Sequence, residues 1–397
     1  MIKLLIVDDS ALMRRLIGGV FKANAGFEIA FARDGVEALI QLHNFHPHVV
    51  TLDVHMPQMD GLTCLGRIMV ERPCPVIMVS SLTEAGADAT LEAMNLGAVD
   101  FVAKPEGAVS LAMDEFAPIL LEKVRAASTA RLSPALRLTE RVKLKLRTGR
   151  PAPPTRQSPV LTTSPLADVA PPLGDVVVVG CSTGGPAPPT RRSPVLTTSP
   201  LVDVAPPLGD VVVVGCSTGG PPALDALLSS LPANFPWPVV IAQHMPASFT
   251  APLSRRLDKL CALTVSEVTR PVALAPGQVY VGKGDADIIV TLRSDKVVVA
   301  PVPSSPEHRW HPSVDRLVST ALHHLGGKRL IGVMMTGMGD DGAAAMTRLR
   351  REGGRTIAEA KETAVVWGMP GELVRMGGAE VVAPLGSIAQ HLVDWAS

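Results

Sequence analysis

The sequence predicts two α/β domains joined by a proline-rich segment. Residues 1–108 and 209–397 each alternate short apolar runs with amphipathic helical patterns, as in parallel sheets covered by helices on both faces. Residues 109–208 form the expected linker, because their Pro/Ser/Thr-rich stretch lacks the apolar density of a core. The length of 397 residues, 47% of them hydrophobic, suits two or three domains.

In residues 1–108 the pattern predicts four strands and three helices. The expected strands are 3–9, 48–53, 75–81 and 98–105. The expected helices are 11–23, 34–43 and 88–97. Ligands of such parallel sheets bind at the carboxyl ends of the strands.

In residues 209–397 the alternation continues, and the middle of this domain is expected to be antiparallel within a mainly parallel, doubly wound fold. The expected strands are 210–215, 237–244, 263–268, 278–282, 286–292, 296–301, 329–337, 355–360 and 379–384. The expected helices are 224–231, 251–260, 313–325, 342–353 and 387–396.

The composition argues against several classes of protein. Lys plus Arg equals Asp plus Glu at 37 each, so a broad basic surface for nucleic acid is not expected. The five cysteines are scattered, which fits a reducing compartment better than a disulfide scaffold. No apolar run reaches the roughly 18 residues of a membrane span, and the N-terminus lacks the order of a signal peptide. We therefore expect a cytoplasmic protein with no nucleic-acid partner and no membrane insertion.

A 35-residue unit occurs twice in tandem, at 151–185 and at 186–220. The copies differ only at Gln157/Arg192 and Ala167/Val202, which indicates a recent tandem duplication, or an error in the assembled sequence, rather than a solenoid of diverged repeats. Each copy ends in GCSTGG, so the two serines, Ser182 and Ser217, are rival nucleophiles.

The residues after each serine favour Ser217 as the nucleophile. A nucleophile elbow needs a strand, a tight glycine turn and then a helix. Ser182 precedes PAPPTRRSP, whose prolines prevent a packed helix. Ser217 precedes a helical pattern with one apolar face, formed by Leu224, Leu227, Leu228 and Leu231. The N-terminus of that helix would also supply N–H groups for an oxyanion.

Polar residues at the strand ends of the N-terminal domain form a second constellation. Asp8 and Asp9 follow the first strand, Asp53 ends another, and Ser80 and Lys104 end two more. Carboxylates are ligands of Mg²⁺, and a neutralised carboxylate beside an ammonium group can attack a phosphoryl donor. These residues resemble the receiver domain of response regulators, a flavodoxin-like fold, over residues 1–108.

The resemblance to receivers assigns roles to these residues. It implies that Asp53 is the phosphoacceptor, with a chemotaxis histidine kinase as phosphodonor. It implies that Asp8, Asp9 and Asp53 hold the Mg²⁺ that phosphorylation needs. It also implies a phosphorylation switch made of Ser80, Phe101 and Lys104.

A serine nucleophile needs a base and a residue that orients the base. His244 follows a buried-type strand in VVIAQHMP, and Asp341 follows another in VMMTGMGDDGA. Together with VVVVGCSTGG and HPSVDRL, these motifs resemble the effector domain of CheB-type chemotaxis methylesterases over 209–395. The resemblance implies a triad of Ser217, His244 and Asp341. Asp340 stands where the family has Asn, which leaves two aspartates as candidates to orient His244.

The combined resemblance implies the function. It indicates a phosphorylation-activated hydrolase that removes methyl esters from glutamates of methyl-accepting chemotaxis receptors and deamidates receptor glutamines. The backbone N–H of Thr218 would hold the oxyanion, Met338 would border the pocket, and the esterase step needs no cofactor. The unphosphorylated receiver is expected to pack over the Ser217 cleft.

Other functions remain open at the level of sequence. One alternative is a non-enzymatic response regulator, whose C-terminal domain would only bind partners. Another is a general small-ester hydrolase, which would use the same candidate triad. A DNA-binding output is disfavoured because no compact three-helix domain with a basic recognition helix is visible. Cys216 is a rival thiol nucleophile, but its neighbour Ser217 already occupies the exposed position of the turn, which favours a buried packing role for Cys216.

Overall fold

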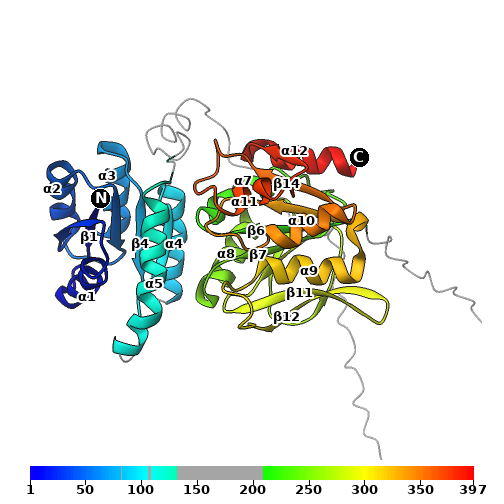
Figure 1. The fold of residues 1–397 in the computed structure, drawn as a ribbon, viewed down its shortest axis with the longest axis horizontal. Coiled ribbons are helices and arrows are strands. Elements are labelled where there is room, and N and C mark those ends of the chain that lie inside the picture. The colour runs from blue at the N-terminus through cyan, green and yellow to red at the C-terminus, as the bar shows by residue number, and fades with distance from the viewer. Residues whose placement is uncertain (82, 106–108, 131, 133–208) are drawn as a thin grey trace, which may run out of the picture. The chain divides into compact units, whose positions relative to one another are not determined.

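A computed structural model describes residues 1–81, 83–105, 109–130, 132 and 209–397. The described residues up to 132 and those from 209 to 397 belong to one compact unit that contains two sheets of parallel strands (Figure 1). Ser182, the first copy of the repeat and the Pro/Ser/Thr-rich stretch lie outside the described residues, so their predictions stay predictions.

The N-terminal sheet has five strands in the order β2-β1-β3-β4-β5, and all neighbours are parallel. Its strands are β1 (Ile2–Val7), β2 (Phe27–Ala32), β3 (Val49–Asp53), β4 (Val76–Ser80) and β5 (Asp100–Ala103). Because the strands are parallel, their carboxyl ends meet at one edge.

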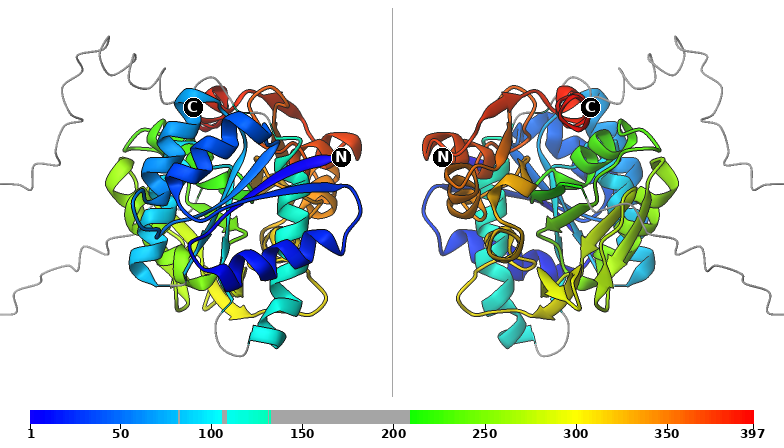
Figure 2. Two further views of the ribbon diagram at one scale, coloured as in Figure 1. Left: turned by 90° about the vertical axis from the view of Figure 1, so that its left-hand side faces the viewer. Right: turned by 90° about the vertical axis from the view of Figure 1, so that its right-hand side faces the viewer.

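Five helices cover both faces of this sheet (Figure 2). They are α1 (Ala11–Lys22), α2 (Gly35–Phe45), α3 (Gly61–Glu71), α4 (Glu84–Leu96) and α5 (Val109–Ala127). Apolar residues of α1 and α5 pack on Leu4 and Ile6 of β1, whereas those of α2, α3 and α4 join a cluster with Leu5 and Val7. Successive side chains of β1 thus point to opposite faces of the sheet, and helices cover both faces. For this reason the strand is apolar at every position from Leu4 to Val7.

Three elements of this domain were not predicted. Strand β2 is an edge strand that pairs only with β1 and is half-buried, so its sequence lacks a continuous apolar run. Helices α3 and α5 contain helix-disfavouring residues, among them Gly66 in α3 and Pro118 in α5. Phe116, Leu120 and Val124 of α5 are buried in the sheet's core, so the packed domain extends beyond the predicted boundary at residue 108.

The C-terminal sheet has seven strands in the order β15-β14-β13-β6-β7-β10-β8, again parallel throughout. Its strands are β6 (Val211–Cys216), β7 (Val239–Gln243), β8 (Thr264–Val268), β10 (Gln278–Gly282), β13 (Leu330–Met334), β14 (Arg355–Glu359) and β15 (Val381–Ala383). A separate antiparallel sheet contains β9 (Val272–Ala273), β11 (Ala286–Arg293) and β12 (Lys296–Pro303).

Helices also cover both faces of the seven-stranded sheet. They are α7 (Gly220–Ser229), α8 (Ala247–Leu260), α9 (Val314–Leu325), α10 (Ala343–Arg351), α11 (Met369–Arg375) and α12 (Leu385–Ala396), with a short 3₁₀ helix at Gly327–Arg329. In β6, Val212 and Val214 pack with α7, α8 and α12, whereas Val211 and Val213 pack with α9, α10 and α11. The central strand is thus buried on both sides, as its four-valine run predicts.

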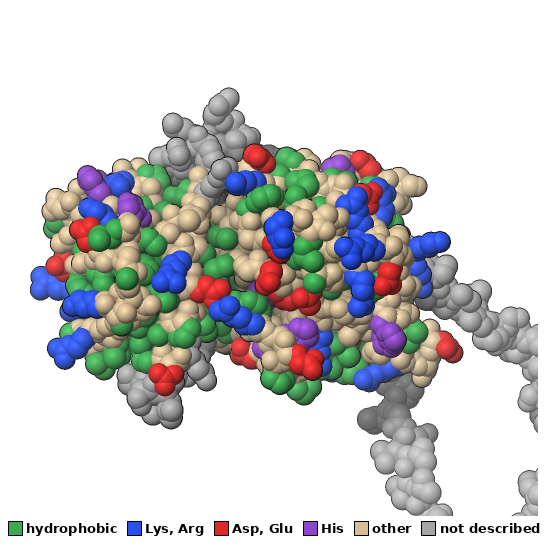
Figure 3. All heavy atoms as spheres, in the orientation of Figure 1, with side chains coloured by type: hydrophobic (Ala, Val, Ile, Leu, Met, Phe, Trp, Pro, Cys, Tyr) green, Lys and Arg blue, Asp and Glu red, His purple; other side chains and the backbone are tan. Residues whose placement is uncertain are grey.

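The predicted fold class is confirmed: two α/β domains with mainly parallel sheets, and an antiparallel section within the second domain. Every strand and helix predicted in 209–397 is present, and the unpredicted additions are the two-residue β9, the 3₁₀ helix and the seven-residue α11. Among the described residues, no helix combines the length and the apolar character needed to cross a bilayer. On the face seen in Figure 3, basic and acidic side chains are interspersed, consistent with the zero net charge.

Candidate active site and phosphoacceptor site

Ser217 lies in the turn between β6 and α7. Its backbone N–H donates to the carbonyl of Thr336 (3.0 Å), and its carbonyl accepts from the N–H of Gly220 (2.8 Å). Gly219 has a φ of +79°, a left-handed conformation that favours glycine. The helix then begins at Gly220 with prolines in its first turn, where they are tolerated. This is the strand, glycine turn and helix that a nucleophile elbow needs.

Close packing holds the Ser217 turn in place. A Cβ atom on Gly337 would lie 2.9 Å from the Cβ of Ser217, so the loop after β13 approaches the serine as only glycine allows. The side-chain amide of Gln243 donates to the Ser217 carbonyl (3.0 Å). Leu224, Leu227, Leu228 and Leu231 are all buried, as their spacing predicted.

His244 follows β7 and faces Asp341. Its Nε2 lies 2.8 Å from Oδ2 of Asp341, and its side chain is only 5% exposed. Its Nδ1 is buried and has no hydrogen-bond partner among the described residues. The ring stacks on Trp310, with centroids 5.6 Å apart and planes 13° apart. If Nε2 carries the proton that Asp341 accepts, Nδ1 is the lone-pair atom available as a base.

Asp341 is buried and fully hydrogen-bonded. Besides His244, it accepts from the N–H groups of Val314 (2.7 Å) and Asp315 (3.0 Å) and from the hydroxyl of Ser313 (3.1 Å). Burial acts to raise its pKa, but the bond from His244 and the backbone donors outweigh it and hold the pKa of Asp341 below its ordinary value. Its neighbour Asp340 is exposed. The structure therefore brings Asp341, and not Asp340, to His244.

Two of the three candidate triad residues open onto one cleft of about 640 Å³. Ser217 and His244 line it, together with Thr218 and Met338, the predicted oxyanion and pocket residues. Cys216 does not line this cleft and is fully buried in β6. Burial raises the pKa of its thiol, which disfavours the reactive thiolate.

At the carboxyl edge of the N-terminal sheet, three carboxylates converge. Oxygen atoms of Asp8, Asp9 and Asp53 all lie within 4.8 Å of one another. Lys104 points its ammonium group at two of them, 2.6 Å from Oδ2 of Asp53 and 3.0 Å from Oδ2 of Asp8. The structure thus brings together four of the residues that the sequence placed at this edge.

The charge balance of this acidic cluster fits a divalent cation. Burial raises the pKa of Asp8; Lys104 opposes that effect, whereas the neighbouring charge of Asp53 adds to it. Burial lowers the pKa of Lys104, but its bonds to Asp53 and Asp8 outweigh burial and leave the pKa raised. Three hard oxygen donors with a surplus of negative charge are the donor set that Mg²⁺ prefers.

The other predicted switch residues are buried near this edge. The hydroxyl of Ser80 donates to the carbonyl of Gly86 (3.2 Å). Phe101 packs against Phe249 of α8, with ring centroids 4.3 Å apart. Beside it, Asp100 accepts a hydrogen bond from the hydroxyl of Thr218, the residue after the candidate nucleophile. The side chain of Asp100, next to Phe101 in β5, therefore contacts the residue that follows Ser217.

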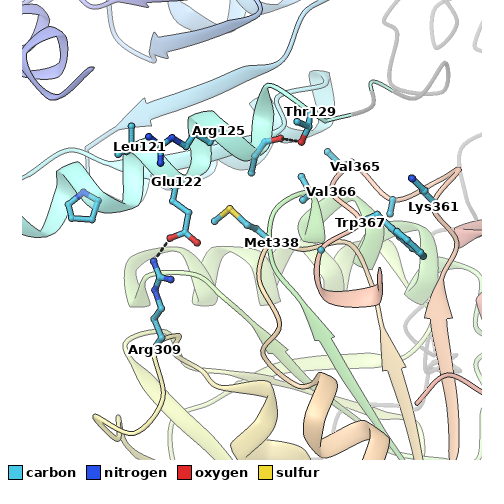
Figure 4. A pocket seen from close by; sticks show the side chains of 14 residues that line it. Leu121, Glu122, Arg125, Thr129, Arg309, Met338, Lys361, Val365, Val366 and Trp367 are labelled. Atoms are coloured by element: carbon cyan, nitrogen blue, oxygen red, sulfur yellow. Dashed lines mark hydrogen bonds and ion pairs between the residues drawn. The ribbon is translucent and has the colours of Figure 1, made fainter. Parts of the chain in front are cut away.

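Helix α5 provides a second link to the C-terminal domain. Figure 4 shows Glu122 of α5 reaching the guanidinium of Arg309, with which it forms an ion pair. The surrounding cleft, of about 890 Å³, is also lined by Met338 and Trp367. Met338 lines the Ser217 cleft as well, so the two clefts share a wall.

Three further polar residues near the site were not singled out by sequence. Asp287 and His311 form a hydrogen-bonded pair beside Asp341. Glu359 is fully buried and accepts from the N–H of Thr336, whose carbonyl accepts from the N–H of Ser217. His311 begins the motif HPSVDRL quoted above, and Asp287 lies 24 residues before it, but nothing in the letters pairs the two. Glu359 ends a strand, which is the one signal that could have marked it.

Comparisons with known proteins match both domains. A family model described as CheB methylesterase matches residues 212–392, and one described as response regulator receiver domain matches residues 4–113. The chain is 51% identical over 395 residues to protein-glutamate methylesterase/protein-glutamine glutaminase 2 of Rhodopseudomonas palustris (strain BisB18), covering 100% of the chain and 98% of that protein.

A second relative and a solved structure carry similar names. Protein-glutamate methylesterase/protein-glutamine glutaminase 3 of Rhodospirillum rubrum is 47% identical over 397 residues, covering 100% of the chain and 97% of that protein. The crystal structure of the Thermotoga maritima CheB methylesterase catalytic domain is 38% identical, with a TM-score of 0.46, covering 47% of this chain and 98% of that one.

The chain belongs to the protein-glutamate methylesterase/protein-glutamine glutaminase family. The predicted family and enzyme class are therefore confirmed, and the methylesterase domain is preceded by a response-regulator receiver domain. The candidate nucleophile, base and acid all lie within the residues that the methylesterase model matches. Asp8, Asp53 and Lys104 lie within those that the receiver model matches.

Proposed function

We propose that the chain is a phosphorylation-activated hydrolase that acts on chemotaxis receptors in the cytoplasm. It would remove methyl esters from receptor glutamates and deamidate receptor glutamines, with Ser217 as nucleophile, His244 as base and Asp341 as the residue that orients His244. The observation that carries the proposal is the pairing of His244 with Asp341 through Nε2. It leaves Nδ1 of His244 without a hydrogen-bond partner among the described residues, while His244 lines the same cleft as Ser217.

The reaction follows from this arrangement. Nδ1 of His244 takes the proton of the Ser217 hydroxyl, and the oxygen attacks the γ-carbonyl carbon of the substrate. The Thr218 N–H, at the start of α7, would stabilise the oxyanion. His244 then gives its proton to the leaving group, so methanol leaves from the ester and ammonia from the amide. Water hydrolyses the acyl-enzyme by the same proton transfers and restores Ser217. None of these steps needs a cofactor.

In the receiver, Asp53 would accept the phosphoryl group, with a histidine kinase as donor. Asp8, Asp9 and Asp53 would hold Mg²⁺, which offsets negative charge on phosphoryl oxygens when bound. Lys104 already contacts the Asp53 carboxylate and would contact the phosphoryl group in its place.

The contacts of the receiver support regulation of the esterase. Phe101 packs on Phe249, and its neighbour Asp100 accepts from Thr218, so a movement of β5 acts on the Ser217 turn. Phosphorylation of Asp53 would draw Ser80 and Phe101 toward the phosphoryl group and weaken these contacts, opening the cleft to receptors. This is a population shift biased by a local change of charge.

The experiment is methanol release from methylated receptor membranes by wild type, Ser217→Ala and Ser182→Ala, each with and without a small phosphodonor. We expect release to be lost only in Ser217→Ala, by at least about 10³-fold, and to be stimulated by the phosphodonor in wild type. Loss only in Ser182→Ala would move the nucleophile to the first repeat. Unchanged release with the phosphodonor would contradict the regulatory part.

The same experiment separates the rival functions. A general small-ester hydrolase would turn over simple esters but release no methanol from receptors. A non-enzymatic response regulator would show no difference between wild type and Ser217→Ala on either substrate.

A further inference from the structure

A second histidine–aspartate pair lies beside the first. Nδ1 of His311 is 2.9 Å from Oδ1 of Asp287, which also accepts the N–H of Ser313 (2.8 Å). The hydroxyl of the same Ser313 donates to Asp341, the partner of His244 (3.1 Å). Ser313 therefore joins the two pairs, and the orientation of His311 is fixed relative to the catalytic acid.

Asp287 is held as a buried, ionised acceptor. It is 1% exposed, and its Oδ2 accepts from Nη1 of Arg316 (2.6 Å) and from the N–H of Ser305 (3.2 Å). Burial acts to raise its pKa, but the bonds from His311, Ser313 and Arg316 outweigh burial and lower the pKa. Because Arg316 already balances the charge of Asp287, a neutral His311 ring that donates from Nδ1–H satisfies the pair.

His311 reaches the active-site cleft. Its side chain is 22% exposed, and it lines the cleft of about 640 Å³ together with Ser217 and His244. The preceding residue, Trp310, stacks on the His244 ring. Since Asp287 occupies Nδ1, the second ring nitrogen, Nε2, is the polar atom that His311 has left for a substrate.

We propose that His311 is the residue that distinguishes glutamine from glutamate methyl ester in this active site. The inference rests on the proposed function, because it assigns His311 to the substrate cleft of the Ser217 reaction. Its Nε2 would accept a hydrogen bond from the carboxamide of a glutamine substrate and would have no such partner on an ester.

The chemistry of the two leaving groups gives the discrimination. A neutral imidazole that donates from Nδ1 has a lone pair on Nε2. The carboxamide nitrogen of glutamine carries two N–H donors, and it still carries them after Ser217 attacks and before ammonia leaves. The ester oxygen of a methyl ester carries only lone pairs. A contact at Nε2 therefore stabilises the transition state of deamidation and not that of demethylation.

Two substitutions that differ by one methylene group test this inference. In His311→Asn the amide nitrogen takes the place of Nδ1 and keeps the bond to Asp287, but nothing replaces Nε2. In His311→Gln the side-chain amide reaches the place of Nε2 and can offer its carbonyl oxygen as an acceptor. The measurement is kcat/KM for ammonia release from glutamine-bearing receptor membranes and for methanol release from methylated ones, with Ser217→Ala as the control.

In His311→Asn we expect deamidation to fall about ten-fold more than demethylation, the effect of one hydrogen bond. In His311→Gln we expect the ratio of the two rates to return to within about three-fold of wild type. A ratio in His311→Asn that stays within about three-fold of wild type would overturn the inference and leave His311 a structural residue. A loss of folding in that variant would lower both rates together and would not by itself change their ratio.

Two other outcomes count against the inference. A ratio that shifts toward deamidation in His311→Asn would mean that Nε2 donates to the ester, which is the opposite assignment. If Ser217→Ala retains both activities, the proposed function itself is wrong, because the reaction then takes place outside the cleft that His311 lines. That result is distinct from a failure of the inference about His311 alone, in which Ser217→Ala is inactive.

Discussion

Asp8 and Asp341 are two buried carboxylates at the carboxyl edges of parallel sheets, and they are held in opposite ways. Their exposed fractions are 1% and 9%. Yet the pKa of Asp8 is raised above its ordinary value, and that of Asp341 is lowered. Burial acts in the same direction at both sites, so the difference comes from what surrounds each carboxylate.

The surroundings differ in donors and in neighbouring charge. Asp341 accepts from two backbone N–H groups, the Ser313 hydroxyl and His244. Asp8 accepts from the N–H of Ser10 (2.9 Å), shares Lys104 with Asp53, and lies beside the like charge of that aspartate. One site stabilises a permanent anion that can orient an imidazole. The other has a deficit of positive charge that a divalent cation would fill.

The largest test of this comparison removes the charge of Asp341. In Asp341→Asn the amide cannot both accept from the backbone N–H groups and accept from Nε2 of His244, so the wrong imidazole tautomer is favoured. We expect kcat for methanol release to fall by about 10⁴-fold. The matched control is Asp340→Asn, one residue away and exposed, for which we expect kcat within about two-fold of wild type. The reverse pattern would assign the orienting role to Asp340.

Glu359 extends the comparison to a carboxyl group with fewer donors than Asp341. It is fully buried; Oε2 accepts from the N–H of Thr336 (2.8 Å), and Oε1 has no partner among the described residues. Burial raises its pKa from 4.5 to about 7, against the smaller opposing effects of Thr336 and Thr363. Because the folded-state pKa is raised, the stabilising contribution of Glu359 is complete below about pH 4.5 and is lost as the pH rises through 7.

Glu359→Gln keeps the acceptor for Thr336 and cannot ionise. We expect the variant to gain stability over wild type between pH 5 and pH 8, by on the order of 3 kcal/mol at the upper end. Urea unfolding of both proteins at the two pH values measures the gain. Equal stabilities at pH 8 would mean that the ionised carboxylate is solvated or paired, which contradicts its burial as described.

The smallest expected effect concerns Asp8. Asp8→Asn keeps the acceptor for Ser10 and removes one of the three neighbouring negative charges. Without Mg²⁺ at pH 7, we expect the thermal unfolding midpoint to rise by roughly 2–5 °C. Added MgCl₂ should raise the midpoint of wild type and leave that of the variant unchanged. A fall of the metal-free midpoint would show that the ion pair with Lys104, and not repulsion and burial, dominates at Asp8.

Most of the fold could be predicted from the sequence because both sheets are parallel and buried on two faces. Such strands must be continuous apolar runs, so β6 and β13 are visible in the letters alone. The elements that were missed lack that signal. Strand β2 is half-buried at an edge, α5 contains Pro118, and α11 has only seven residues.

The candidate site also contains residues that the sequence predicts and residues that it does not. The positions of Asp8, Asp53, Ser217 and His244 after apolar runs place them at strand ends, because parallel strands share one carboxyl edge. Gly219 is likewise readable, since a serine turn into a helix needs a residue that tolerates positive φ. By contrast, Asp340 and Asp341 have the same side chain and nearly the same neighbours in the sequence. Local pattern therefore does not indicate which of them orients His244.

What the sequence by itself determined was therefore the two α/β domains and the strand ends at which the functional residues stand. Only the tertiary structure decided which aspartate faces His244, that Nε2 is the nitrogen it contacts, and that Ser313 joins this pair to Asp287 and His311. The physical reason is that periodicity reports which face of an element is buried. Hydrogen-bond partners depend on the directions of side chains brought together from distant segments, and those directions are set only when the core has packed.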